Sequence, residues 1–273
     1  MTTQAADCHL HVFDPVRFPY AKDAAYMPPP HEAGRIDDLL PVMDAHGISH
    51  ALAVGPTAGY GPDNSCLLDA IARSDGRLKG IGVVLPGATD KALAALKAGG
   101  VIGNRLDFSA RGAALFMSPE GRRLIDQCRA MGWIVQVQFE GDQLVEAADV
   151  LRKAKVPLIF DHCGRPLPER GLQQPGFQAL LALGREGHAV KLSGPFRFSR
   201  QGPPHADVEP YVQAILDAFT PDRCVWGSDW PFLRMASRID YGPVLAHLDR
   251  WVPDPAARRK ILWDTPKRLF GFG

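Results

Sequence analysis

The strongest constraint on the fold is a repeat in which a short apolar run precedes a segment with helically spaced apolar residues. Eight such runs occur, and most are apolar throughout rather than alternating, which is typical of parallel strands covered on both faces. Strand followed by helix, eight times over, predicts an α/β fold, a single (β/α)8 TIM barrel. The expected strands are Ala6–Val12, His50–Pro56, Leu78–Leu85, Gly103–Phe108, Trp133–Phe139, Pro157–Cys163, His188–Gly194 and Cys224–Asp229.

The length of the chain agrees with this barrel, which usually takes about 250 residues. The chain has 273 residues and no dividing linker, so residues 1–273 are expected to form one domain. A doubly wound open sheet is the alternative, but no GxGxxG turn follows the first strand. Asn64 and Ser118 are expected to cap their helices. The expected helices are Ile36–His46, Asn64–Arg73, Thr89–Ala98, Ser118–Met131, Asp142–Arg152, Phe177–Arg185, Val208–Phe219, Tyr241–Trp251 and Pro255–Trp263, before a turn at Thr265–Leu269.

Composition excludes several classes of partner. Lys plus Arg is 31 and Asp plus Glu is 30, so a net charge of +1 provides no basic field for nucleic acid. The sequence contains no run of about 18 apolar residues, so no membrane span is expected. Its amino-terminal stretch lacks the basic and apolar segments of a secretory signal. The five cysteines are odd in number and form no CxxC pair, which favours reduced, buried thiols in a cytoplasmic protein.

Polar residues interrupt the apolar runs where the strands end, which is the working face of such a barrel. His9 and His11 lie two residues apart, so both point to the interior while Leu10 faces the helices. His162 follows the sixth strand, and Asp229 ends the eighth. Converging imidazoles bind a divalent metal or hydrogen-bond a carbonyl oxygen. Asp229 has two kinds of expected role. Its carboxylate either caps the segment that follows, or it is buried and forms an ion pair, binds a metal or takes part in the reaction.

Three arginines suit the recognition of an anion. Arg105 and Arg111 lie at and beyond the fourth strand, and Arg197 lies beyond the seventh. Guanidinium groups bind carboxylates through paired hydrogen bonds, so these side chains predict a locally positive pocket that the total charge hides. The alternative for Arg105 is an ion pair with Asp107, which lies two residues further along the same strand.

Polar residues inside two further strands extend this interior surface. Gln136 and Gln138 share one face of the fifth strand and are expected to line the site. Lys191 lies within the seventh strand, where it either presents a positive charge to the mouth or pairs with a nearby acid.

Three segments together carry a family resemblance. They are DCHLHVF at Asp7–Phe13, DHCGRP at Asp161–Pro166 and WGSDWP at Trp226–Pro231. In this order, over nearly the whole chain, they resemble the amidohydrolase superfamily. The nearest likeness is to its amidohydrolase-2 branch and the 2-pyrone-4,6-dicarboxylate lactonase-like hydrolases within it.

The resemblance implies hydrolysis of a cyclic ester in a carboxylated substrate. His9, His11 and His162 would then polarise the lactone carbonyl. Asp229 would accept a proton from the attacking water. The resemblance further implies substrate contacts from Arg105, Arg111, Arg197, Tyr26, Thr57 and Gln138.

The sequence also departs from the lactonase pattern, and the departures fall in the pocket. Gln138 stands where the lactonase has a tyrosine, and Asp107 stands where it has an asparagine. The stretch Thr57–Tyr60 is one residue longer and lacks a histidine. These changes leave the substrate open among pyrone-dicarboxylate-like and sugar-acid lactones.

The strand ends argue against the superfamily's usual binuclear metal site. That site needs a bridging Lys or Glu on the fourth strand and further histidines beyond it, whereas this chain offers Arg105, Asp107 and two glutamines. We expect catalysis that requires no metal, or one divalent ion, Zn²⁺ or Mn²⁺, held by His9, His11 and Asp229.

Lactone hydrolysis in aromatic or sugar-acid catabolism is therefore the leading functional hypothesis. A decarboxylase or lactone isomerase of the same branch would use the same histidines and aspartate. A barrel that binds a small acid without turnover is the alternative from another class. The expected partner is a small anionic substrate, not nucleic acid or a membrane, and the sequence allows a homo-oligomer.

Overall fold

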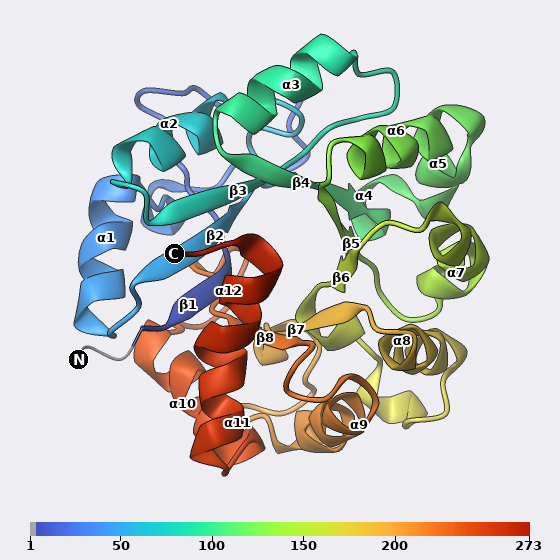
Figure 1. The fold of residues 1–273 in the computed structure, drawn as a ribbon. Helices are drawn as coiled ribbons and strands as arrows, with labels where there is room; N and C mark the ends of the chain where they lie inside the picture. The colour runs from blue at the N-terminus through green and yellow to red at the C-terminus, as the bar shows by residue number, and fades with distance from the viewer. Residues whose placement is uncertain (1–3) are drawn as a thin grey trace.

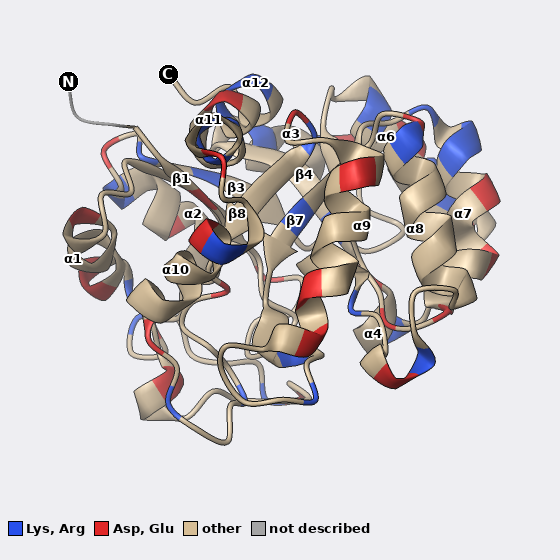
Figure 2. Ribbon diagram, turned by 90° about the horizontal axis from the view of Figure 1, so that it is seen from below, with Lys and Arg blue, Asp and Glu red and all other residues tan. Residues whose placement is uncertain are grey.

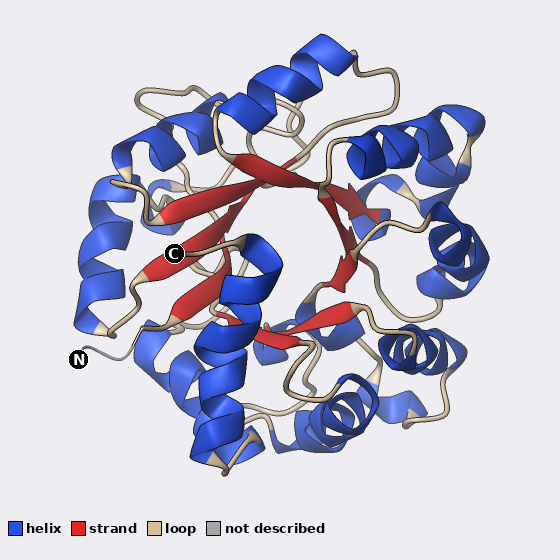
Figure 3. Ribbon diagram, viewed as in Figure 1, coloured by secondary structure: helices blue, strands red, loops and turns tan. Residues whose placement is uncertain are grey.

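A computed structural model describes residues 4–273 and contains an eight-stranded parallel sheet in the order β1 to β8. The sheet closes on itself, because His11 N–H donates to Trp230 O at 2.8 Å and Asp229 N–H donates to His9 O at 2.7 Å. Helices surround the strands (Figures 1 and 3). The predicted (β/α)8 barrel is confirmed. The strands are β1 Ala6–Leu10, β2 His50–Val54, β3 Leu78–Gly82, β4 Val101–Asp107, β5 Ile134–Gln138, β6 Leu158–Phe160, β7 Ala189–Ser193 and β8 Cys224–Gly227.

Each predicted helix is present within a few residues of its expected bounds. The end of the chain differs from the prediction. A π-helical turn at Lys260–Asp264 follows the helix Pro255–Arg259, and Thr265–Phe270 forms a further helix where a turn was expected. The helices are α1 Ile36–Ala45, α2 Ser65–Arg73, α3 Asp90–Ala98, α4 Phe108–Arg111, α5 Ala113–Met117, α6 Pro119–Ala130, α7 Gln143–Ala154, α8 Pro175–Arg185, α9 Glu209–Phe219, α10 Tyr241–Trp251, α11 Pro255–Arg259 and α12 Thr265–Phe270.

The hydrogen bonds at the helix starts show which of the predicted side-chain caps form. Ser118 Oγ accepts from Gly121 N–H at 3.0 Å, so its predicted cap is confirmed. The predicted cap at Asn64 is wrong, because its amide bonds both backbone groups of Val83. The short helix α4 was not foreseen; Asp107 Oδ1 starts it by accepting from Ala110 N–H at 3.0 Å.

The core has two layers that leave a polar zone at one end of the barrel. Inside, Cys8, Leu52, Val54 and Ile81 pack with the aromatic rings of the chain end, and a larger apolar layer lies between strands and helices. All five cysteines are buried and free, as predicted. Charged residues of both signs occur along the outer helices (Figure 2). In residues 4–273 no helix is long and apolar enough to cross a membrane.

A register shift in β1 accompanies the orientation of the first two site residues. The pairing of β1 with β2 shifts between Asp7 and Leu10, and such an irregularity changes which side chains face the interior. His9 N–H donates to Asp7 Oδ1 at 3.0 Å, and Ser228 N–H donates to the same oxygen at 2.9 Å. Leu10 packs in the outer layer. His9 and His11 therefore both reach the interior, as the spacing predicts.

Candidate active site

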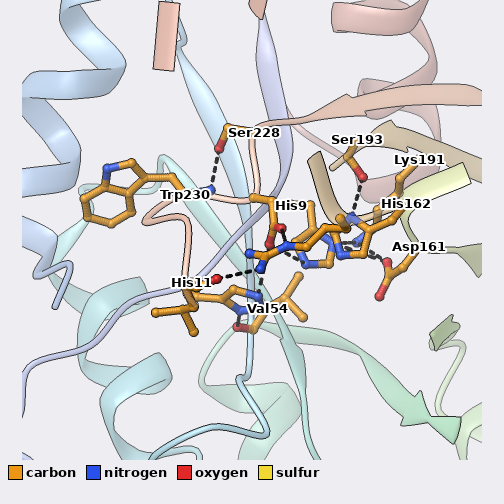
Figure 4. A network of polar contacts seen from close by, with 12 residues as sticks. His9, His11, Val54, Asp161, His162, Lys191, Ser193, Ser228 and Trp230 are labelled. Atoms are coloured by element: carbon orange, nitrogen blue, oxygen red, sulfur yellow. Dashed lines mark hydrogen bonds and ion pairs between the residues drawn. The ribbon is translucent and has the colours of Figure 1, made fainter. Parts of the chain in front are cut away.

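Four fully buried side chains form a polar cluster inside the barrel, below its open end. Lys191 Nζ lies 2.6 Å from Gln136 Oε1, 3.1 Å from His9 Nδ1 and 3.2 Å from Asp161 Oδ1. Gln136 Nε2 donates to Asp161 Oδ2 at 2.8 Å. We call His9, Gln136, Asp161 and Lys191 the floor cluster; Figure 4 shows His9, Asp161 and Lys191 side by side. Lys191 thus pairs with an acid, which was one of its two predicted roles.

His11 and Asp229 lie just above the floor cluster. His11 Nδ1 lies 2.7 Å from Val54 O, which directs its Nε2 to within 3.6 Å of Asp229 Oδ1. His9 Nε2 lies 3.8 Å from the same oxygen. Arg197 Nε donates to Asp229 Oδ2 at 2.5 Å. One carboxylate oxygen therefore faces both histidines, and the other is held by a guanidinium.

His162 completes this group from the end of β6. Its Nδ1 lies 2.9 Å from Ser193 Oγ, and its ring centroid lies 4.4 Å from that of His9. His162 and Asp229 both have a left-handed backbone, with φ of 49° and 64°. Such conformations cost about 1–3 kcal/mol in non-glycine residues and cluster at functional sites. The structure thus brings together all four predicted catalytic residues.

Burial and neighbouring charge set the protonation of these groups. Burial lowers the pKa of His9 and His162 well below the usual range and that of His11 to about 4. Nearby cations reinforce the shift at His9 and His11, whereas Asp229 opposes it at His162. Burial alone would raise the pKa of Asp229, but Arg197 and the histidines outweigh it and lower this pKa. The site at neutral pH is therefore an ionised carboxylate among neutral imidazoles.

The floor cluster balances its charges internally. Burial alone would raise the pKa of Asp161, but Lys191 and Arg105 outweigh it, so the pKa is lowered. Burial also lowers the pKa of Lys191, and Asp161 opposes that shift. The ionised pair is stabilised by its own hydrogen bonds rather than by water.

A cavity of about 520 Å³ opens above Asp229 and His11. Its size suits a small ligand. Five arginines and four acids line it, so excess positive charge is present but small. The cavity is lined by every residue predicted to bind substrate, namely Arg105, Arg111, Arg197, Tyr26, Thr57 and Gln138.

A polar chain across the cavity wall connects several of these residues. Arg105 contacts Gln138 Oε1 through Nη2, and its Nε lies 3.6 Å from Asp161 Oδ2. Gln138 Nε2 lies 3.4 Å from Asp107 Oδ1, and Thr57 Oγ1 donates to Asp107 Oδ2 at 2.8 Å. The ion pair considered for Arg105 and Asp107 is not formed in the described chain; Gln138 bridges the two instead.

Two cavity arginines keep donors free for a ligand. In residues 4–273 neither Arg111 nor Arg234 pairs with an acid, and Arg111 Nε is buried without a hydrogen-bond partner. The Arg234 guanidinium lies 4.2 Å from the ring centroid of Tyr26, whose hydroxyl donates to Glu32 at 2.6 Å. We define Tyr26, Thr57, Arg111 and Arg234 as the rim.

Sequence reasoning missed several members of the site. Asp161 and Arg165 stand in the DHCGRP segment that was singled out, yet neither was given a role. Arg165 lines the cavity and pairs with Glu140. Arg234 lies on the loop after β8 and carried no local signal.

The site contains atoms that fit one divalent ion. His9, His11 and Asp229 each place a ligand atom within 4.8 Å of the others, and His9 Nε2 is buried without a hydrogen-bond partner. Two imidazoles and a carboxylate are ligands suited to Zn²⁺ or Mn²⁺. A second described group, His9, Asp161 and His162, shares His9 with the first. Lys191 already contacts both His9 and Asp161, which disfavours two ions together.

The fold and site define a (β/α)8-barrel enzyme with its site at the carboxyl ends of the strands. The chain belongs to the amidohydrolase family, whose model matches residues 6–272. It is 38% identical to 4-sulfomuconolactone hydrolase of Rhizobium radiobacter over 98% of this chain and 90% of that protein. It is 30% identical to 2-pyrone-4,6-dicarboxylate hydrolase of Comamonas testosteroni over 97% and 90%. The crystal structure of a probable 2-pyrone-4,6-dicarboxylic acid hydrolase from Acinetobacter baumannii, with citric acid bound, has a TM-score of 0.88 at 28% identity, covering 100% of both chains.

Proposed function

We propose that this protein hydrolyses the ester bond of a small lactone that carries at least one further anionic group. The observation that carries the proposal is Asp229, whose free oxygen faces His9 and His11 at the base of an arginine-lined cavity. The relatives named for lactone hydrolysis support it, because they match nearly the full chain.

The proposed reaction begins with a water molecule held by Asp229 Oδ1. This oxygen accepts a proton as the water oxygen bonds to the carbonyl carbon, and neighbouring imidazole N–H groups stabilise the developing oxyanion. The ring C–O bond then breaks, and the proton held by Asp229 passes to the ring oxygen. Lactone and water give one hydroxy acid or its keto tautomer, so atoms and charge balance.

The rim supplies the proposed recognition of the substrate's anionic group. Arg111 and Arg234 have no acidic partner in the described chain, so a ligand anion gains two charges that are not already neutralised. Arg197 is held by Asp229 and by Leu233 O at 2.5 Å, and it keeps one nitrogen free. Tyr26 and Thr57 also line the cavity, with their hydroxyls donated to Glu32 and Asp107.

The proposed catalysis requires no metal, and one ion remains compatible with the site. His9 Nε2, His11 Nε2 and Asp229 Oδ1 would hold it, and a bound Zn²⁺ or Mn²⁺ would polarise the lactone carbonyl. Metal analysis of the purified protein, followed by activity measurements after chelation, tests this part. Loss of activity on chelation, with recovery on adding one ion, would contradict the metal-free form.

A panel of carboxylated, sulfonated and sugar lactones tests the function. Hydrolysis releases acid, so a pH indicator reports it, and the product mass rises by one water. A mass loss of CO₂ would instead establish a decarboxylase, and an unchanged mass with a new retention time an isomerase. Ligand-induced thermal stabilisation without any product would favour a non-catalytic binding protein.

A further inference from the structure

Lys191 faces three acceptor atoms inside the barrel, two through hydrogen bonds and the Asp161 carboxylate as an ion pair. Its side chain is fully buried, and its Nζ lies within 3.2 Å of Gln136 Oε1, His9 Nδ1 and Asp161 Oδ1. A lysine ammonium has three protons to donate and no lone pair to offer. The number of acceptors therefore equals the number of donors.

The orientation of Gln136 supports this assignment of protons. Its Nε2 donates to Asp161 Oδ2 at 2.8 Å, which leaves its carbonyl oxygen towards Lys191. The opposite orientation would place an NH₂ group against the ammonium and an oxygen against the carboxylate. All three neighbours of Nζ therefore accept, and His9 Nδ1 is one of them.

We propose that Lys191 is a positioning residue that keeps the single proton of the His9 ring on Nε2, making His9 a hydrogen-bond donor to the reacting carbonyl oxygen. His9 Nε2 is buried and lies 3.8 Å from Asp229 Oδ1, at the base of the cavity. This location and polarity suit an oxyanion donor. The catalytic role of His9 rests on the proposed lactone hydrolysis. The position of the proton on its ring does not depend on that function.

His11 has the opposite tautomer for an equally local reason. Its Nδ1 lies 2.7 Å from the carbonyl oxygen of Val54, which can only accept, so Nδ1 carries the proton. Its Nε2 therefore presents a lone pair 3.6 Å from Asp229 Oδ1. A water held between His11 and Asp229 would therefore donate to both, which gives the two histidines of one motif different proposed tasks.

The same contact opposes metal binding. An ion held by His9 and His11 needs a lone pair on both Nε2 atoms, and Lys191 leaves a proton on that of His9. Without Lys191, His9 Nδ1 would donate to Asp161 Oδ1, which lies 3.2 Å away. That arrangement is the carboxylate–histidine–metal pattern common in zinc sites.

Nitrogen-15 NMR of histidine-labelled protein tests the tautomers directly, without substrate. Assignment uses spectra of His9→Gln and His11→Gln, each of which removes one set of resonances. We expect a protonated Nε2 for His9 and a protonated Nδ1 for His11. A protonated Nδ1 on His9 in the wild-type protein would overturn the proposal, whether or not any lactone is hydrolysed.

The substitution Lys191→Met tests the consequence for metal binding. We expect the His9 proton to move to Nδ1 and Zn²⁺ affinity to rise about tenfold or more, measured by competition with a chromophoric chelator. Ser193→Ala is the matched control, because it removes the partner of His162 and leaves Lys191 in place. Unchanged His9 resonances and unchanged Zn²⁺ affinity in a folded Lys191→Met protein would overturn the proposal; should the variant not fold, the wild-type NMR result decides it.

Discussion

The floor cluster and the rim both consist of polar side chains, but they differ in how their contacts are made. His9, Gln136, Asp161 and Lys191 are fully buried and bind one another. Arg111 and Arg234 face the cavity with donors that no acid in residues 4–273 occupies. Burying polar groups is costly unless their partners are fixed, so the floor cannot adapt to a ligand. The floor cluster is therefore fixed by its own contacts, whereas the rim keeps donors that a ligand can occupy.

The largest expected effect comes from Asp229, the residue that joins the two regions. Asp229→Asn keeps the side-chain shape and removes the proton acceptor, so kcat should fall about 10³-fold. Steady-state kinetics on the best lactone measures this effect. The thermal midpoint should stay close to that of the wild-type protein, and a kcat within a few-fold of wild type would refute Asp229 as the base.

The rim should affect binding more than turnover. Arg111→Met removes a charged donor with no acidic partner in the described chain, so KM for an anionic lactone should rise about 10–100-fold with a small change in kcat. Arg129→Met is the matched control, because Arg129 pairs with Asp126 on the outer surface of α6. An unchanged KM in the Arg111 variant would indicate a neutral ligand group at this position.

A change at Arg197 should shift the pH dependence, because this cavity residue donates a hydrogen bond to Asp229. Arg197 lowers the pKa of Asp229 and contributes to the low pKa of His11, about 4. Arg197→Met should raise the pKa values of Asp229 and His11, so both residues should become protonated at a higher pH than in the wild-type protein. The acidic limb of kcat/KM should move upward by about one pH unit. A limb that stays in place would show that Arg197 does not control the carboxylate.

The smallest expected effect concerns stability at a residue beneath both regions. Burial raises the pKa of Asp7 from 3.8 to about 6. Between these values the folded state holds a proton that the unfolded chain has lost, so stability falls as pH rises through this window. Asp7→Asn keeps an acceptor for His9 and Ser228 without the charge. It should gain on the order of 1–3 kcal/mol at about pH 8 and little at about pH 4, measured by urea unfolding. An equal change in unfolding free energy at both pH values would contradict a destabilising buried charge on Asp7.

The sequence predicted the barrel and the positions of His9, His11, His162 and Asp229, because strand periodicity places residues at strand ends on one face. Their roles remain predictions. It did not predict which acid Lys191 would pair with, because Asp161 reaches Lys191 only once β6 and β7 pair in the sheet. Local rules also failed at Asn64, where a tertiary contact with Val83 replaces the cap.

The β1–β8 junction has a consequence for how activity first arises. Ser228 N–H reaches Asp7 across 221 positions of sequence, where β1 and β8 lie side by side (Figure 1). His9 lies on β1, and Asp229 follows β8 by two residues. A nascent or truncated chain that ends before β8 therefore lacks Asp229, the proposed base, whatever part of the barrel it has formed. Closing such a distant contact is a slow step in folding. The recovery of enzymatic activity during refolding would consequently report when β1 and β8 pair. Far-UV circular dichroism would report the earlier formation of the helices.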